Sequence, residues 1–181
     1  MLVPDNSIFV IANSSGANFS AHVGTITRRL ADVASLLSVP IIIADYPANC
    51  STQLIDTECS MRDDFLRIPF EPGTAEWRSS KLATALVETG RRQLLICGYW
   101  LEEGVSLLAL HASLVGFDAN VTVDLSPALC PELSPILQMR LVQHNVVVTT
   151  STQVLREWAA LASVENRAAL ESLIAIHQPS S

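Results

Sequence analysis

The stretch that decides the fold is TGRRQLLICGYWLEEGVSLLALHASLVGFDANVTVD, residues Thr89–Asp124. Within it, the short apolar run Leu94–Gly98 predicts a buried strand. The Ala- and Leu-rich segment Glu102–Val115 predicts a helix that ends at Gly116, and Ala119–Asp124 predicts a second strand. Two apolar strands separated by a helix indicate a parallel β-α-β unit.

The same alternation continues outward on both sides of this unit. Further strands are predicted at Ser7–Asn13, Val39–Asp45, Leu66–Phe70 and Val146–Thr149. Further helices are predicted at Ser20–Leu37, at Ser79–Thr89, after Pro131, from Ser151 as N-cap, and over Val164–Ile176. This pattern predicts an α/β fold, a three-layer α/β/α sandwich around a mostly parallel, doubly wound sheet of five or six strands. Because the sequence has no repeat, low-complexity tract or linker, we expect residues 1–181 to form a single domain.

The composition favours subunit contacts. Hydrophobic residues make up 49% of the chain, whereas charged residues make up only 16%, below the roughly 25% of an average soluble domain. A surface with so little charge is often covered by another subunit, so we expect a homo-oligomer. In the alternative, Ser, Thr, Asn and Gln supply the surface polarity.

Charge and cysteine content exclude several partners. The net charge is −7 and Lys81 is the only lysine, which argues against nucleic acid as a partner. No apolar run reaches the roughly 18 residues of a membrane span, and the first residues lack the basic region of a signal peptide. The four cysteines form no CxxC pair, so we expect thiols in a reducing cytoplasm, with a Cys50–Cys59 disulfide as the alternative.

Two segments carry a more specific resemblance, Thr89–Asp124 and Leu137–Leu161 (LQMRLVQHNVVVTTSTQVLREWAAL). In the first, the strand ends at Gly98, LEEGV begins the helix, and Gly-Phe-Asp precedes the strand that ends at Asp124. The chain resembles the isochorismatase-like cysteine hydrolases, particularly their small bacterial branch of unassigned substrate. The order of elements fits that family across nearly the whole chain.

The resemblance implies a catalytic cysteine at a helix N-terminus, an aspartate that ends the first strand, and a lysine. The cysteine position matches Gly104 and the aspartate position matches Asn13. The lysine position falls at Glu71 or Phe70, depending on a one-residue gap. Because none of these side chains can perform the implied chemistry, we expect a non-catalytic binding or structural protein, without a cofactor.

Other readings of the sequence remain open. A hydrolase could use a water activated by Glu71 or Glu103, or a relocated cysteine at Cys50 or Cys59. His111, two turns beyond the Gly104 position, is interpreted as a packing residue rather than a catalytic base. Cys97, His22 and Lys81 are interpreted as a core cysteine, an exposed or pocket-rim histidine and a solvated lysine.

The remnant pocket is expected to draw on eight residues: Asn13, Phe70, Glu71, Trp77, Trp100, Glu102, Glu103 and Gly104. We expect empty space beside Gly104 and no cation near the carboxylates, so a small neutral or cationic ligand fits better than an anion. Trp77 or Trp100 could supply an aromatic wall. Trp100, with Tyr99, is also expected to be covered in part by a neighbouring subunit. Some relatives hold a metal after their second strand, but DYPAN (residues 45–49) has no histidine, so no metal is expected.

Overall fold

The computed structural model of this chain describes residues 1–15, 20–47, 65–71 and 77–175. They contain one six-stranded parallel sheet in the order β3-β2-β1-β4-β5-β6. This confirms the predicted fold class and the higher of the two strand numbers. The strands are β1 (Ser7–Ser15), β2 (Ile41–Pro47), β3 (Leu66–Pro69), β4 (Gln93–Gly98), β5 (Asp118–Thr122) and β6 (Val147–Thr149).

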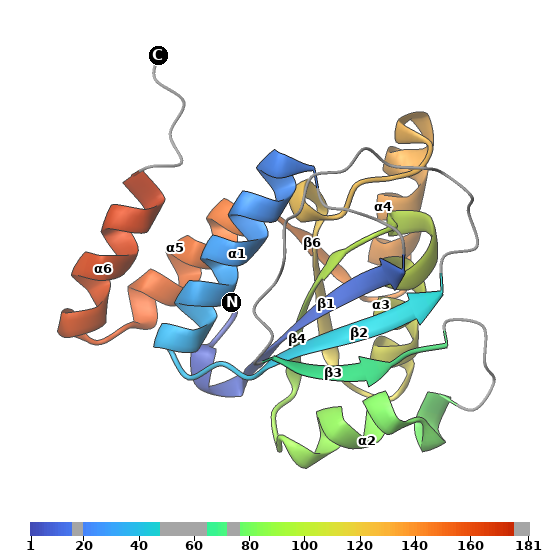
Figure 1. Ribbon diagram of the computed structural model, residues 1–181, viewed down its shortest axis with the longest axis horizontal. Helices are drawn as coiled ribbons and strands as arrows, with labels where there is room; N and C mark the ends of the chain where they lie inside the picture. The colour runs from blue at the N-terminus through green and yellow to red at the C-terminus, as the bar shows by residue number, and fades with distance from the viewer. Residues whose placement is uncertain (16–19, 48–64, 72–76, 176–181) are drawn as a thin grey trace.

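Helices cover both faces of the sheet (Figure 1). One layer contains α1 (Ala21–Leu36), α5 (Ser151–Leu161) and α6 (Val164–Ala175). The other contains α2 (Lys81–Glu88), α3 (Ser106–Leu114) and α4 (Ser134–Gln143). The order of strands reverses between β1 and β4, and the crevice at the carboxyl ends of such strands is the usual ligand position in open α/β sheets.

The central strand β1 shows why the predicted strands are apolar without interruption. Successive side chains on a strand point to opposite faces. Phe9 and Ile11 enter the apolar cluster against α1 and α5, while Ile8 and Val10 enter the cluster against α2 and α3. All four are fully buried, because both faces of the sheet are covered.

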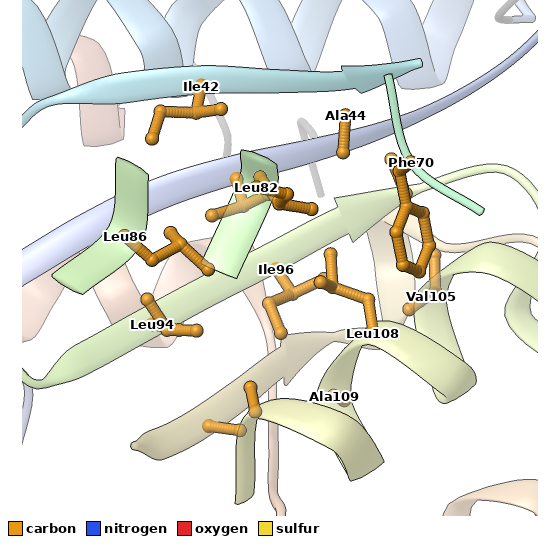
Figure 2. Packing of buried hydrophobic residues seen from close by; sticks show 14 of the residues in the cluster. Ile42, Ala44, Phe70, Leu82, Leu86, Leu94, Ile96, Val105, Leu108 and Ala109 are labelled. Atoms are coloured by element: carbon orange, nitrogen blue, oxygen red, sulfur yellow. The ribbon is translucent and has the colours of Figure 1, made fainter. Parts of the chain in front are cut away.

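The cluster on the α2 and α3 side reaches the carboxyl edge of the sheet. Figure 2 shows Leu82 and Leu86 of α2 over Ile96 of β4, with Phe70 and Val105 near the strand ends. Fully burying each such side chain stabilises the fold by about 1.5–3 kcal/mol relative to exposure. Apolar packing therefore extends to the carboxyl ends of the strands, where ligands usually bind in open α/β sheets.

The predicted helix Glu102–Val115 begins differently from the expectation. A π-helical turn, η3 (Leu101–Val105), precedes α3, and the N–H of Val105 donates to the carbonyl of Trp100, five residues earlier, at 3.3 Å. The turn that contains Gly104 is therefore wider than an α-helical turn.

Two predicted element ends are wrong for reasons of local hydrogen bonding. Asp124 does not end a strand, because β5 stops at Thr122 and Asp124 lies in the short helix η4 (Val123–Leu125), where its carboxylate accepts the N–H of Ser151 at 2.9 Å. Ser151 is not the N-cap of α5. That position belongs to Thr150, whose hydroxyl accepts the N–H of Gln153 at 3.2 Å. The remaining short helices are η1 (Pro4–Asn6), η2 (Trp77–Ser79) and η5 (Pro131–Leu133).

Gly98 closes β4 where that strand lies against β1. Its φ of +124° is one that side chains rarely adopt, and a Cβ there would lie 2.8 Å from the backbone N of Ala12. The N–H of Tyr99 then donates to the carbonyl of Ala12 at 3.0 Å. Glycine is therefore required where the chain turns from β4 toward the candidate site.

Candidate functional site

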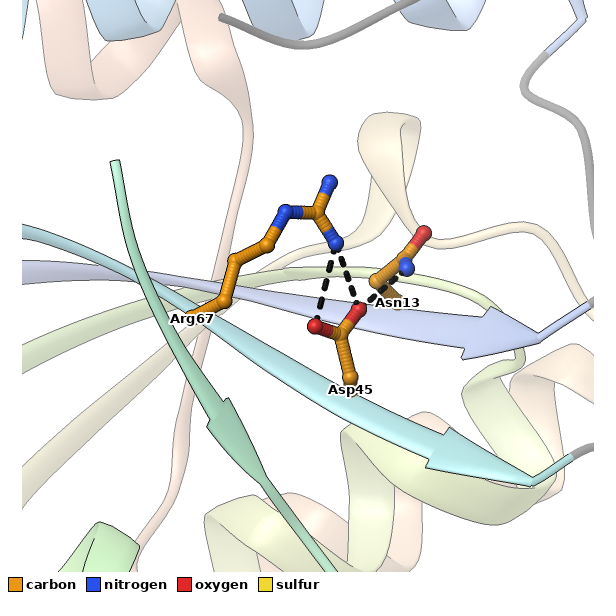
Figure 3. A network of polar contacts seen from close by, with 3 residues as sticks. All are labelled: Asn13, Asp45 and Arg67. Atoms are coloured by element: carbon orange, nitrogen blue, oxygen red, sulfur yellow. Dashed lines mark hydrogen bonds and ion pairs between the residues drawn. The ribbon is translucent and has the colours of Figure 1, made fainter. Parts of the chain in front are cut away.

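A polar cluster of three residues lies near the carboxyl ends of β1 and β2, where the side chain of Arg67 reaches in from β3 (Figure 3). Asn13 is directly opposite Asp45 in the β1–β2 register, and its Nδ2 donates to Asp45 Oδ1 at 2.5 Å. Arg67, two residues before the register partner of Asp45 on β3, donates from one nitrogen to both Asp45 oxygens at 2.8 and 3.0 Å. The side chains of Arg67 and Asp45 are 44% and 35% exposed, so water screens this ion pair.

This cluster corrects the expectation that no cation lies near the site. Arg67 supplies a guanidinium beside Asp45, which also bonds to Asn13, and Asp45 neutralises it. Asp45 could be placed from sequence, because it ends a predicted strand and the carboxyl ends of parallel strands meet. Arg67 could not be placed from sequence. Its contact with Asp45 depends on the β2–β3 register, in which Pro69 pairs with Asp45, and on the length of the arginine side chain.

The Gly104 position is filled, which corrects the expectation of empty space beside it. A Cβ built on Gly104 would lie 2.7 Å from the Tyr46 hydroxyl oxygen and closer still to ring carbons Cε1 and Cζ. Real Cβ atoms do not approach other heavy atoms so closely, so any side chain at residue 104 requires the Tyr46 ring to move. The ring of Tyr46 therefore occupies the space into which a side chain at residue 104 would extend.

Hydrogen bonds and ring contacts hold Tyr46 in this position. Its hydroxyl donates to the carbonyl of Tyr99 and accepts the N–H of Trp100 at 2.6 Å. Its ring meets the Phe70 ring edge to face, with centroids 6.1 Å apart. Tyr46 is 2% exposed, so these polar groups are satisfied away from water.

The two candidates for the lysine position differ in environment. Phe70 is 2% exposed and packs between Ala44, Val105 and Leu108 (Figure 2). Glu71, the next residue, is exposed. The chain therefore presents a ring to the interior and a carboxylate to solvent, and neither residue places a cation beside Gly104.

Trp77 and Trp100 belong to opposite sides of the sheet. Trp77 packs with the α2 and α3 cluster, where it stacks on His111 with ring centroids 5.4 Å apart and an angle of 9° between planes. It also lines a cavity of about 490 Å³ with Val87, Leu114 and Phe117, between α2 and the end of α3. The stacking agrees with the interpretation of His111 as a packing residue.

Trp100 packs with the cluster that contains α1 and α5, against Tyr99 at a centroid distance of 4.7 Å. Tyr99 and Trp100 are only 3% and 8% exposed within this single chain. The expectation that a neighbouring subunit covers them is therefore wrong, because their own chain already buries them. Trp77 and Trp100 also cannot face each other as walls of one pocket.

The adjacent carboxylates Glu102 and Glu103 have different surroundings. Glu102 accepts the backbone N–H groups of Leu129 and Cys130, both at 2.9 Å, and so holds the chain that follows η4. Oxygen Oε2 of Glu103 is buried and has no hydrogen-bond partner among the described residues. Burial, and then the charge of Glu102, raise the pKa of Glu103 above its ordinary value.

Comparison with known proteins supports this architecture. No protein-family model matches the chain, and no curated protein matches its sequence. Solved structures do match. MAR1 ribonuclease of Caenorhabditis elegans superposes with a TM-score of 0.78 at 14% identity, covering 99% of this chain and 94% of that one. The chain has the isochorismatase-like fold.

Two further matches carry that fold. The YcaC gene product of Escherichia coli, described as an octameric hydrolase of unknown specificity, gives a TM-score of 0.72 at 18% identity over 96% of this chain and 88% of that one. An isochorismatase of Pseudomonas putida KT2440 gives 0.65 at 16% identity over 84% and 91%. Identities this low establish the shared fold, while the activity of this chain is a separate question.

The two described free cysteines, Cys97 and Cys130, differ in environment. Cys97 is fully buried in β4, and burial, with a smaller contribution from the charge of Asp124, raises the pKa of its thiol. A thiol that stays protonated is a poor nucleophile, which agrees with its interpretation as a core residue. Cys130 is exposed and free. Cys50 and Cys59, with the predicted alternative disulfide, lie outside the described residues.

The described part of the chain contains neither a cluster of metal-ligating side chains nor a helix that could cross a membrane. No group of three or more His, Cys, Asp or Glu side chains there is placed to hold a metal ion. Asp45, at the end of β2, bonds to Arg67 and Asn13 instead. None of the described helices is both long and apolar enough to cross a bilayer.

Proposed function

We propose that this chain is a non-catalytic isochorismatase-like protein that acts by binding, as a homo-oligomer. The observation that carries the proposal is the Tyr46 ring in the space beside Gly104. A nucleophile at that position needs room for its own side chain and for a substrate carbonyl. The hydroxyl of Tyr46 also accepts the N–H of Trp100, a backbone donor at the same site.

The groups around Gly104 point the same way. Asn13 replaces the base that the resemblance implies, and its amide is engaged with Asp45. Phe70 packs in the interior where a lysine would be needed, and the one described thiol near the sheet edge, Cys97, is buried. Each of the three implied roles therefore lacks a side chain of suitable chemistry.

The ligand of this proposal is a small neutral or cationic molecule. Asp45 neutralises Arg67, so the carboxylates of Glu71, Glu102 and Glu103 dominate the remaining charge. Burying an anion beside several carboxylates costs free energy, whereas an amide or amine does not meet that repulsion. Tyr46 closes the site beside Gly104, so the ligand would bind above Asn13, Asp45 and Arg67.

A second candidate function rests on Glu103. Its buried oxygen without a described partner and its raised pKa make it a stronger base than an ordinary glutamate. A water deprotonated by this carboxylate could attack a small ester or amide, which would make the chain a hydrolase with non-standard groups.

One experiment separates the two functions. The purified protein and its Glu103→Gln and Glu71→Gln variants are assayed against a panel of small esters and amides, with Lys81→Gln as a matched surface control. The proposal expects no turnover above background in any of them. Turnover that disappears in Glu103→Gln or Glu71→Gln but persists in Lys81→Gln would replace binding by hydrolysis.

The ligand is tested by thermal shift with matched neutral, cationic and anionic small molecules. Stabilisation by amides or amines, reduced in Asn13→Ala, is the expected result. Stabilisation by dicarboxylates alone, abolished by Asn13→Ala, would show that Arg67 rather than the carboxylates determines ligand charge.

Assembly and location complete the proposal. The low charged fraction of the chain supports a homo-oligomer, and a free exposed thiol at Cys130 suits the reducing cytoplasm. The octamer described for Escherichia coli YcaC shows that this fold can assemble, and for the present chain the assembly is tested by its mass in solution.

A further inference from the structure

The outer face of α4 exposes apolar side chains on a helix with little charge. Leu133, Ile136 and Met139 are 47%, 63% and 61% exposed. Leu133 is the last residue of η5, which runs directly into α4, and the three side chains follow one another at intervals of three residues, so they form one stripe. The opposite side of α4 packs on the sheet through Leu137 and Leu141. The stripe therefore faces away from the core of its own chain.

The charges at the ends of this stripe are arranged symmetrically about Ile136. Glu132 lies four residues before it and Arg140 four residues after it, and both are exposed. Ile136 and Arg140 lie on one ridge of α4, and Glu132 lies in η5, which leads into the start of that helix. Neither side chain forms an ion pair within the part of the chain that the structure describes. One end of the ridge is therefore negative and the other positive.

We infer that this stripe, centred on Ile136 and bounded by Glu132 and Arg140, binds the same stripe of a second copy in an antiparallel, two-fold arrangement. In that geometry Ile136 meets its own copy, and Glu132 lies beside Arg140 of the partner subunit, twice per dimer. A parallel arrangement would place like charges together. A two-fold interface must be self-complementary, and the order of charges along this ridge fulfils that condition.

This inference rests on the homo-oligomer of the proposed function and names its surface. It also replaces the expectation of a subunit contact at Tyr99 and Trp100, because these two residues are buried within their own chain. Exposed apolar residues at the ends of other helices, such as Val87 and Leu114, lack a symmetric pair of charges about a centre.

The test is charge reversal at the two ends of the ridge, followed by sedimentation velocity at micromolar concentration. Glu132→Arg and Arg140→Glu each place like charges together twice per dimer, and each should weaken association at least about tenfold. The double variant Glu132→Arg/Arg140→Glu restores opposite charges and should return to within a few-fold of the wild type. Ile136→Glu should dissociate the interface as well.

Val164→Glu is the matched control, because Val164 is 83% exposed and lies on α6, in the helix layer on the other face of the sheet. It should leave the mass unchanged, and circular dichroism should show that every variant is folded. A wild-type mass of one chain would overturn both the homo-oligomer and this surface. A wild-type oligomer that survives Ile136→Glu, or a double variant as dissociated as the single ones, would overturn this surface alone.

Discussion

Asp45 and Tyr46 are neighbours on β2, yet they define two opposite kinds of environment at the same edge of the sheet. Asp45 points to the side of Ile43 and forms an exposed polar cluster with Asn13 and Arg67 (Figure 3). Tyr46 points to the other side and closes the space beside Gly104. Successive side chains on a strand point to opposite faces, so these two adjacent residues lie on opposite sides of the sheet. Water therefore reaches the polar cluster around Asp45, whereas a packed ring fills the space beside Gly104.

The largest expected effect is the removal of that ring. Tyr46→Ala should lower the free energy of unfolding by about 3–5 kcal/mol, as for other buried aromatic side chains. Tyr46→Phe keeps the ring but removes the hydroxyl's hydrogen bonds to the Tyr99 carbonyl and the Trp100 N–H, and should cost about 1–3 kcal/mol. Chemical denaturation measures both. A loss below about 1 kcal/mol for Tyr46→Ala would mean that the ring does not fill this space.

Filling the same space from the other side should have the next largest effect. Gly104→Ala should cost about 1–3 kcal/mol by overpacking. In the Tyr46→Ala background the methyl group has room, so the cost should largely disappear. Additive losses in this double-mutant cycle would contradict the contact.

Gly104→Cys extends the same contrast to activity. The new thiol meets the Tyr46 ring and has only the amide of Asn13 where a base is needed, so no ester or amide hydrolysis should appear in a panel assay. The pKa of the new thiol should remain well above that of activated cysteines, as measured by the pH dependence of alkylation. Turnover by this single variant would show that the site has kept its other catalytic groups.

A smaller effect on stability, dependent on pH, is expected at Glu103. Its pKa is raised in the folded protein, so the folded state binds the proton more tightly than the unfolded state does. Stability should therefore decrease as pH rises from the ordinary glutamate pKa of about 4.3 through the folded value. Glu103→Gln should remove this decrease, so its melting temperature should exceed that of the wild type more at pH ~8 than at pH ~4. A constant difference across that range would be inconsistent with the raised pKa.

The smallest effect should come from the polar cluster. Asp45→Asn breaks the ion pair with Arg67, and because both side chains are exposed the loss should stay below about 1 kcal/mol. Added salt should reduce the difference further. A loss as large as that of Tyr46→Phe would show that the two environments contribute equally to stability.

Several site features were predictable because they depend on local sequence. The run LLICG at residues 94–98 predicts a buried strand, and this predicts Cys97 as a core thiol. The interpretation of His111 as a packing residue also agrees with the structure, since it stacks on Trp77. Periodicity fixes which side of an element faces the core, and these residues follow from that rule.

The sequence by itself determined the alternation of strands and helices, the parallel sheet covered on both faces, and the glycine at residue 104. Only the tertiary structure decided what fills the space beside that glycine. Tyr46 is 58 positions away along the chain from Gly104, and it reaches this space because the sheet order places β2 beside β1 and β1 beside β4. Arg67 meets Asp45 through the β2–β3 register for the same reason. Local patterns specify the faces of each element, whereas contacts between the ends of different strands follow from register and packing across the whole sheet.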